Sequence, residues 1–247
     1  PGKEDFQHTL RYFEQQLLLK KITVHYNTAP TPEALMAFDE VILATGVRPR
    51  QPEIPGIESA SVMTYSEVLK KTRQPGNKIA IIGAGGIGVD VATWLTQASD
   101  NGASFYQHWG IDASISSPGG LQTPHPQLTQ RHVYLLQRRH GKPGASLGKT
   151  TGWIHRLNLK QQHVTVLSGV TYQHIDQGGL HLTINHHPQL LTVDSIILCA
   201  GQESQADLYA PLQALGCTVH KIGGAHQVHE LDARRAIGQA HQLALHL

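Results

Sequence analysis

The chain contains 247 residues, 15% of them charged, and it carries a formal net charge of +2. This length is sufficient for one large or two modest domains with their own cores. A charge this small, with no long run of basic residues, argues against a nucleic-acid partner. No apolar stretch is long enough to span a bilayer and no signal peptide is visible, so we expect no membrane partner.

Cysteine and histidine usage gives little support for metal or redox chemistry. Cys199 and Cys217 cannot build a disulfide framework and lack the CxxC spacing of a redox pair, so we expect two reduced core thiols in a cytoplasmic protein. The 17 histidines are scattered along the chain. No metal site is predicted, because the nearest pairs lack a third ligand at a suitable spacing: His186 with His187, and His226 with His229.

The first predicted element is an amphipathic helix. Phe6, Leu10, Phe13 and Leu17 recur at helical spacing and predict this helix over residues 4–19. The elements predicted next are a strand at 22–26, a helical turn beginning at Thr31, a buried strand at 41–44, an extended proline-rich connection at 47–57, a short helix at 62–71 and a boundary at 74–77.

A glycine loop at residues 83–88 is the central motif of the chain. The apolar run 79–82 predicts a buried parallel strand, and helix-compatible sequence follows at 89–97. The residues between them fit the pattern G-x-G-x-x-G: Gly83, Ala84, Gly85, Gly86, Ile87 and Gly88. In this pattern the first glycine permits a tight turn, the second lets the backbone approach a pyrophosphate, and the third lets the helix pack on the strand. The amides and positive dipole at the helix start would hold the phosphates, so these six residues are predicted to bind a dinucleotide.

The second half of the chain begins with an irregular insertion at 98–131. An internal segment of this length without periodicity is usually functional or poorly ordered. The elements predicted after it are a strand at 132–136, a loop at 141–152, a helix at 153–161, strands at 164–167 and 170–173, a hairpin of 180–184 with 190–193, a buried strand at 195–200, and a final strand, Gly223-Gly224 turn and helix from near Glu230.

Two arginines at the end of the strand 132–136 bear on the choice of nucleotide. In a dinucleotide-binding fold, a carboxylate at this place binds the ribose 2′-hydroxyl of NAD, whereas an arginine accommodates the 2′-phosphate of NADP. Here the strand is followed by Arg138 and Arg139, and no carboxylate competes. We therefore predict that these guanidinium groups hold the 2′-phosphate of NADPH. A solvated arginine pair is the alternative.

Several segments resemble a known family. Ala44-Thr45-Gly46, the glycine loop and Ala200-Gly201 occur in the order used by two-dinucleotide flavoprotein reductases of the glutathione-reductase-like group. The segments at 147–156 and 230–237 are similar to the C-terminal part of bacterial NADPH-dependent 2,4-dienoyl-CoA reductases, and this resemblance extends over essentially the whole chain.

The resemblance implies an α/β fold with a Rossmann-like NADPH-binding domain, 74–196, inserted into an incomplete FAD-type domain, 1–73 and 197–247. In the intact enzyme, which acts on unsaturated acyl-CoA in fatty-acid β-oxidation, NADPH would reduce FAD. Electrons would then pass to an iron–sulfur cluster and FMN in an N-terminal barrel. The residues that would lie at the FAD are Ala44, Thr45, Gly46, Gly201, Gly224, Ala225 and Leu231. No side chain is predicted to act as a catalytic acid or base.

Two departures from that family limit what this chain should do alone. It has no cysteine cluster for an iron–sulfur centre and no first FAD-binding glycine loop upstream, and it begins at Pro1 like a piece of a longer polypeptide. We expect it to bind NADPH, to hold FAD weakly or not at all, and to be inactive on dienoyl-CoA. The alternatives are the C-terminal part of an FMN/FAD enoate reductase or amine dehydrogenase, and an NADP(H)-binding module without activity.

Overall fold

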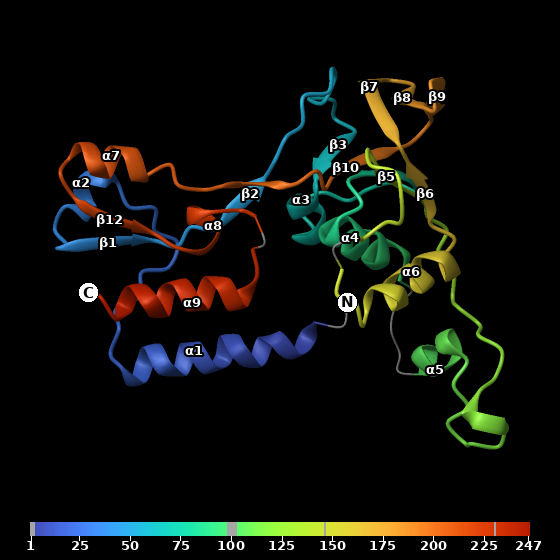
Figure 1. Ribbon diagram of the computed structural model, residues 1–247, viewed down its shortest axis with the longest axis horizontal. Coiled ribbons are helices and arrows are strands. Elements are labelled where there is room, and N and C mark those ends of the chain that lie inside the picture. The colour runs from blue at the N-terminus through green and yellow to red at the C-terminus, as the bar shows by residue number, and fades with distance from the viewer. Residues whose placement is uncertain (1–2, 98–102, 146, 230) are drawn as a thin grey trace. The chain divides into compact units, whose positions relative to one another are not determined.

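The computed structural model describes residues 3–97, 103–145, 147–229 and 231–247 (Figure 1). The chain divides into two compact units, one made of Pro1–Arg48 with Gln202–Leu247 and the other of Pro49–Gly201. One unit is thus inserted into the other, but its boundaries differ from the expected 74–196. Residues 49–73 belong to the inserted unit because strand β3 (Val62–Thr64) pairs with β10 (Ser195–Leu198).

A five-stranded parallel sheet forms the centre of the unit Pro49–Gly201. Its strand order is β3-β10-β4-β5-β6, where β4 is Lys78–Ile82, β5 is His132–Gln137 and β6 is Thr165–Ser168. Successive strands run from β4 to β6 on one side, and β10 returns on the other side of β4. This is the order of a doubly wound sheet, whose ligand crevice lies at the switch point, here between the carboxyl ends of β4 and β10.

Both faces of this sheet are covered (Figure 1). On one face, α3 (Tyr65–Leu69), α4 (Gly86–Thr96) and α6 (Gly152–Gln161) contribute to one apolar cluster with the side chains of β4 and β5. The other face packs against an antiparallel sheet made of β7 (Val170–Asp176), β8 (Gly179–Ile184) and β9 (His187–Leu191). The near-continuous apolar runs of β4 and β10 follow from this burial on two sides.

Two local predictions in this unit need correction. The hairpin of β8 and β9 turns over Asn185 and His186 alone, because both residues adopt left-handed backbone angles, so β9 begins earlier than the expected 190. Residues 62–71 are a strand followed by a helix rather than one helix. The structure therefore changes from extended to helical within the segment that periodicity alone assigned to a single element.

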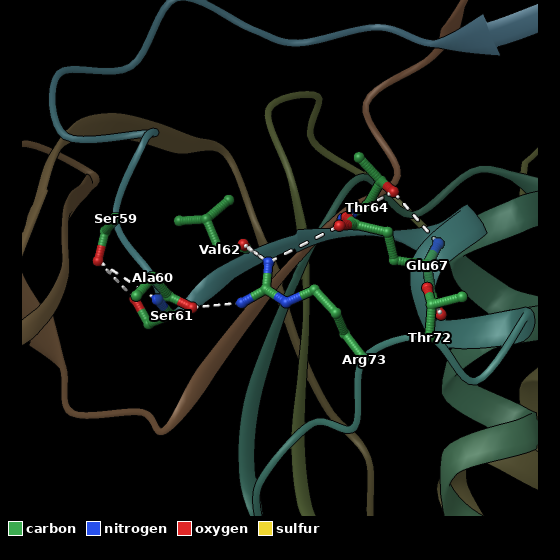
Figure 2. A network of polar contacts seen from close by, with 8 residues as sticks. All are labelled: Ser59, Ala60, Ser61, Val62, Thr64, Glu67, Thr72 and Arg73. Atoms are coloured by element: carbon green, nitrogen blue, oxygen red, sulfur yellow. Dashed lines mark hydrogen bonds and ion pairs between the residues drawn. The ribbon is translucent and has the colours of Figure 1, made fainter.

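A capping box causes that change (Figure 2). The Thr64 hydroxyl accepts a hydrogen bond from the Glu67 amide at 3.3 Å, while the Glu67 carboxylate accepts one from the Thr64 amide at 2.7 Å. This reciprocal pair starts α3 directly after β3. The Arg73 guanidinium donates to the carbonyl oxygens of Val62, at 2.5 Å, and Ala60, which ties the segment after α3 to the strand before it.

The insertion at 98–131 contains more regular structure than expected. Its described part holds α5 (Ala103–Trp109), a 3₁₀ turn at Pro118–Gly120, and an antiparallel bridge that joins Ile111 to Leu121. The Asp112 carboxylate accepts hydrogen bonds from the amides of Ser114 and Ser117, at 3.0 and 2.8 Å, which closes the loop. Hydrogen bonds from the hydroxyls of Ser114, which has the largest effect, and Ser116 hold the pKa of Asp112 far below its usual range. Residues 98–102 of the predicted insertion lie outside the described residues.

The other unit is built on two parallel strands, β1 (Glu40–Leu43) and β12 (Thr218–Lys221). Its small core consists of Val41 and Leu43 of β1 with Leu212 and Ala225. The remaining elements of this unit are α1 (Gln7–Leu19, after a 3₁₀ turn at Glu4–Phe6), α2 (Pro32–Leu35), β2 (Val47–Pro49, whose last residue is the first of the other unit), β11 (Gln202–Ser204, paired with β2), α7 (Tyr209–Ala214), α8 (Gly223–His226) and α9 (Ala233–Ala244).

The structure of this unit departs from the predictions at three places. Residues 22–26 form no strand, since Ile22 bonds back to Leu17 at the end of α1. The helix α7 was not predicted, and the short strand β2 lies in a stretch expected to be only an extended connection. None of the helices in the described part of the chain combines the length and apolarity needed to cross a membrane.

Candidate nucleotide-binding site

The glycine loop connects β4 to α4 at the switch point of the parallel sheet. Gly83 adopts a φ of 114°, and its amide donates to the carbonyl oxygen of Leu136 on β5 at 2.9 Å. A Cβ at position 83 would collide with the carbonyl oxygen of Cys199, which directly follows β10. The tight turn from β4 into α4 passes directly beside the end of β10 and therefore requires glycine at position 83.

The other two glycines of the pattern differ sharply in their surroundings. A Cβ on Gly88 would overlap the carbonyl oxygen of Gly83, so glycine at 88 allows α4 to lie against the end of β4. A Cβ on Gly85 would meet no atom within 4 Å. The space above Gly85 is therefore open, and a diphosphate could approach its backbone there. The open position in this chain is the one that the pattern reserves for the phosphates.

The amino terminus of α4 lacks a capping side chain. Its N-cap residue is Gly85, which makes no side-chain hydrogen bond, and the first turn contains no acidic residue. By contrast, α2, α3 and α9 are capped by the side chains of Thr31, Thr64 and Asp232. The first amides of α4 have no intrahelical partner, and the helix dipole places positive potential on them. This terminus can accept an anionic group from a ligand.

The loop between β5 and α6 lies against the glycine loop. The Gly144 amide donates to the carbonyl oxygen of Ala84 at 2.7 Å, and a Cβ on Gly86 would lie 3.9 Å from the Leu147 side chain. Leu147 and Ile87 both pack on the core beneath α4. Gly144 and Leu147 were not predicted to be site residues, although the glycines at 141–152 indicate that this loop comes close to another backbone.

Arg138 and Arg139 lie at the same edge of the sheet as the glycine loop. Ile82 of β4 is paired in register with Leu136 of β5, so the arginines begin two residues beyond the last paired position. Both are exposed, and among the described residues neither guanidinium has a hydrogen-bond or ion-pair partner. Arg138 is near enough to Tyr172 to oppose part of the rise that burial causes in the pKa of that phenol. Both arginines remain available to an anionic ligand.

The segments that resemble FAD-binding regions come together within the other unit. A Cβ on Gly224 would meet Val47 Cγ1 and the backbone of Gly46, so the start of α8 packs directly on the loop after β1. Within that loop, the Thr45 hydroxyl donates to the Gln205 carbonyl, and Gly46 has a φ of 75° with open space beside it. The remaining predicted residues of this unit are Ala44, which is exposed, Ala225, which is buried, and Leu231, which is half-buried and precedes the N-cap of α9.

Gly201, which was also predicted to lie at the FAD, is the last residue of the unit Pro49–Gly201. Its φ is 106°, and a Cβ there would lie 3.3 Å from Arg50 Nε. The Arg50 side chain donates to the carbonyl oxygen of Ala200, with Nε at 2.9 Å. Gly201 thus forms part of a turn after β10 that an arginine covers.

Both cysteines are free. Cys199 is buried where β10 ends, and burial raises its pKa to about 12. Cys217 is half-buried in the other unit.

Comparison with known proteins places these features in a family. A model described as pyridine nucleotide-disulphide oxidoreductase matches residues 11–232. A metal reductase from Desulforamulus reducens is 27% identical over 248 residues, which cover 98% of this chain and 36% of that protein. A cinnamate reductase from Clostridium sporogenes is 24% identical over 246 residues, which cover 98% of this chain and 32% of that protein.

A solved structure, a 2-naphthoyl-CoA reductase in complex with 2-naphthoyl-CoA, shares the fold with a TM-score of 0.78 at 19% identity. The match covers 98% of this chain and 32% of that one. The chain spans about a third of the length of these relatives.

Proposed function

Because the chain belongs to the pyridine nucleotide-disulphide oxidoreductase family, we propose that it is the NADPH-binding part of a flavoprotein oxidoreductase. Family membership implies that FAD and a nicotinamide nucleotide are bound. In the proposal the unit Pro49–Gly201 holds the nicotinamide nucleotide, and the unit of Pro1–Arg48 with Gln202–Leu247 contributes to FAD binding.

The observation that carries the proposal is the open space at Gly85 on the uncapped terminus of α4. Gly83 and Gly88 are enclosed by backbone and are explained by packing alone. Gly85 has no such explanation, since a side chain would fit there without a clash. A diphosphate bound to the free amides of α4 would explain why this position carries no Cβ.

The preference for NADPH rests on Arg138 and Arg139. Their guanidinium groups are unpaired among the described residues and follow the strand next to β4. An arginine can donate two parallel hydrogen bonds to a phosphate, and the 2′-phosphate distinguishes NADPH from NADH. These side chains therefore supply donors that only one of the two nucleotides can use.

When bound, the nicotinamide supplies a hydride that the flavin accepts. The chain's own contribution is positioning: the glycine loop and α4 hold the diphosphate, and Leu147 with the backbone of Gly144 covers the loop. Near the flavin, the turn at Gly46 and the start of α8 at Gly224 offer backbone without side chains. No acid or base is assigned, because neither group of residues contains a side chain whose proton the reaction requires.

We further infer that the intact protein reduces a conjugated acyl-CoA, such as 2,4-dienoyl-CoA in the breakdown of unsaturated fatty acids. The resemblance of the segments 147–156 and 230–237 to 2,4-dienoyl-CoA reductases supports this substrate, and the similar 2-naphthoyl-CoA reductase is also named for a CoA thioester. In this proposal the substrate binds to a barrel with FMN and an iron–sulfur cluster, outside the present chain. The cinnamate reductase relative favours a free enoate as the alternative substrate.

Nucleotide titration followed by a turnover assay tests the proposal. NADPH and NADH are titrated against the 247-residue chain, which is then mixed with NADPH and an artificial electron acceptor, with and without added FAD. We expect tighter binding of NADPH than of NADH, and reduction of the acceptor only when FAD is supplied in excess. Failure to bind either nucleotide would overturn the assignment of the glycine loop.

Two further outcomes separate the alternatives. Binding without turnover at saturating FAD would favour a nucleotide-binding module over an enzyme part. For the substrate, the full-length protein is assayed for NADPH oxidation with 2,4-dienoyl-CoA and with cinnamate, and a clear preference for cinnamate would replace the acyl-CoA assignment.

A further inference from the structure

The hairpin of β7 and β8 brings two histidines and an aspartate together on its exposed side. His174 of β7 and His181 of β8 are directly paired across the two strands, and their rings stack with centroids 4.0 Å apart and planes 12° apart. Asp176, the last residue of β7, lies beside both. This cluster is remote in sequence from the glycine loop and shares no element with it.

A β-bulge creates the pairing. The register passes from Tyr172 opposite Leu182 to His174 opposite His181, so that Gln173 is the extra residue on β7. Without the bulge, Gln173 would face His181 and His174 would lie on the other face of the hairpin. This is why the spacing of these residues in the sequence did not predict a cluster.

The three polar groups converge on one point. Asp176 Oδ2 lies 2.9 Å from His181 Nε2 and 3.7 Å from His174 Nε2. Two ligand atoms on a tetrahedral zinc ion are roughly 3.4 Å apart, since each lies about 2.1 Å from the metal. All three candidate atoms here lie within 4.8 Å of one another. Side-chain rotation is enough to bring them to the spacing that a bound ion requires.

The carboxylate is held ready for this role by the turn after β7. Asp176 Oδ1 accepts a hydrogen bond from the Gly178 amide at 2.8 Å, which leaves Oδ2 to face the imidazoles. A Cβ on Gly178 would press on Oδ1 at 3.2 Å, so this glycine permits the arrangement. A hydrogen bond that orients a ligating group in this way is common around protein metal sites.

We propose that His174, Asp176 and His181 form a binding site for a divalent transition-metal ion of the zinc class. Two imidazole nitrogens and a carboxylate suit Zn²⁺, whereas Mg²⁺ and Ca²⁺ prefer oxygen ligands alone. The side chains are 46%, 49% and 31% exposed for His174, Asp176 and His181, which leaves room for water as a fourth ligand. A bound ion joins β7 to β8 and stabilises the hairpin.

The test uses the 247-residue chain after removal of metal with a chelator. Zn²⁺ is titrated calorimetrically, Co²⁺ is titrated with visible absorption as the readout, and the melting temperature is measured with and without Zn²⁺. We expect one ion per chain, Co²⁺ bands of a low-coordinate site, and a higher melting temperature with Zn²⁺. His174→Gln, His181→Gln and Asp176→Asn should each weaken Zn²⁺ binding tenfold or more and abolish the rise in melting temperature.

A double variant provides the matched control. His186→Gln with His187→Gln removes two histidines from the neighbouring turn of the same antiparallel sheet, and Zn²⁺ affinity should not change. Equal loss in this control would show general binding to a histidine-rich surface and overturn the proposal, as would the absence of saturable Zn²⁺ binding. Unchanged NADPH affinity in the Asp176→Asn variant verifies that the unit still folds, so a loss of Zn²⁺ binding there is caused by the missing carboxylate and not by unfolding.

Discussion

The backbone of Gly88 lies so close to the carbonyl oxygen of Gly83 that a Cβ at position 88 would overlap it. We therefore expect Gly88→Ala to push α4 away from β4 and to destabilise the unit by roughly 1–3 kcal/mol or more. Urea unfolding followed by tryptophan fluorescence measures this change, because Trp94 of α4 packs against the core. An unchanged unfolding midpoint would mean that α4 does not rest on the loop in this way.

Gly85→Ala is the matched counterpart of that change. The N-cap backbone angles at position 85, φ −76° and ψ −171°, suit any residue, and the added methyl group would meet no protein atom within 4 Å. Stability should change by less than about 1 kcal/mol. NADPH affinity should fall at least about tenfold, because the methyl group occupies the space proposed for the diphosphate. Wild-type NADPH binding in this variant would place the diphosphate elsewhere.

The arginines after β5 should affect one nucleotide more than the other. Each charge-assisted hydrogen bond lost to the 2′-phosphate should cost roughly 1.5–3 kcal/mol. The Arg138→Ala and Arg139→Ala variants should thus weaken NADPH binding tenfold or more while NADH binding changes little. Lys160→Ala, which removes an exposed cation from α6, is the control for net charge. Equal losses for both nucleotides would contradict the assignment of these arginines.

The parts of the fold that were predictable from sequence are those where local pattern and burial agree. The run from Ile79 to Ile82 is buried on both faces of the sheet, and the glycines that follow it are required by backbone contacts. Sequence patterns gave wrong assignments where tertiary contacts determine the secondary structure. Residues 22–26 alternate like a strand but have no paired strand in the structure, and residues 62–64 join the parallel sheet through a pairing with β10 that no local signal reveals.

The site residues likewise divide into those that the sequence predicts and those that only the fold brings together. The glycine loop is a continuous segment, so its residues were identified together. Gly144 and Leu147 reach the loop from a segment about 60 positions further along the chain, and only the fold reveals that contact. The cluster around Asp176 depends on a bulge of one residue, and sequence alternation cannot locate such a bulge.

The capping box at α3 predicts a pH-dependent contribution to stability. Hydrogen bonds from Thr64 lower the pKa of Glu67, and the bond from the Thr64 backbone amide has the largest effect. The native state therefore binds fewer protons than the unfolded chain near pH 4. The stabilisation is then fully present above pH 4.5 and is lost as the pH falls through the lower native pKa. Glu67→Gln should be less stable than wild type by roughly 0.5–1.5 kcal/mol at pH 7.

This deficit should shrink below pH 4.5 in urea unfolding measured at a series of pH values. Glu58→Gln, which neutralises an exposed carboxylate in the same unit, should show no such trend. A deficit for Glu67→Gln that stays constant down to pH 3 would show that the carboxylate is not ionised in its capping hydrogen bonds.

Cys199 should resist modification in the folded protein. Its side chain is 7% exposed, and burial raises its pKa from the usual 9 to about 12, so almost none of the reactive thiolate exists at pH 8. An aromatic disulfide reagent should detect at most one thiol per native chain, that of Cys217, and two after unfolding in guanidinium. Two thiols that react rapidly in the native protein would contradict the burial of Cys199.

The raised pKa of Cys199 also determines how the stability of the protein changes at alkaline pH. The native thiol keeps its proton between pH 9 and about 12, whereas the unfolded thiol releases it, so stability must fall as the pH rises through this range. The slope should be steeper in wild type than in Cys199→Ala by up to about 1.4 kcal/mol per pH unit. Comparing slopes rather than absolute stabilities removes the effect of the small cavity that the substitution leaves beside β10. Parallel slopes for the two proteins would mean that the thiol titrates alike in the folded and unfolded states.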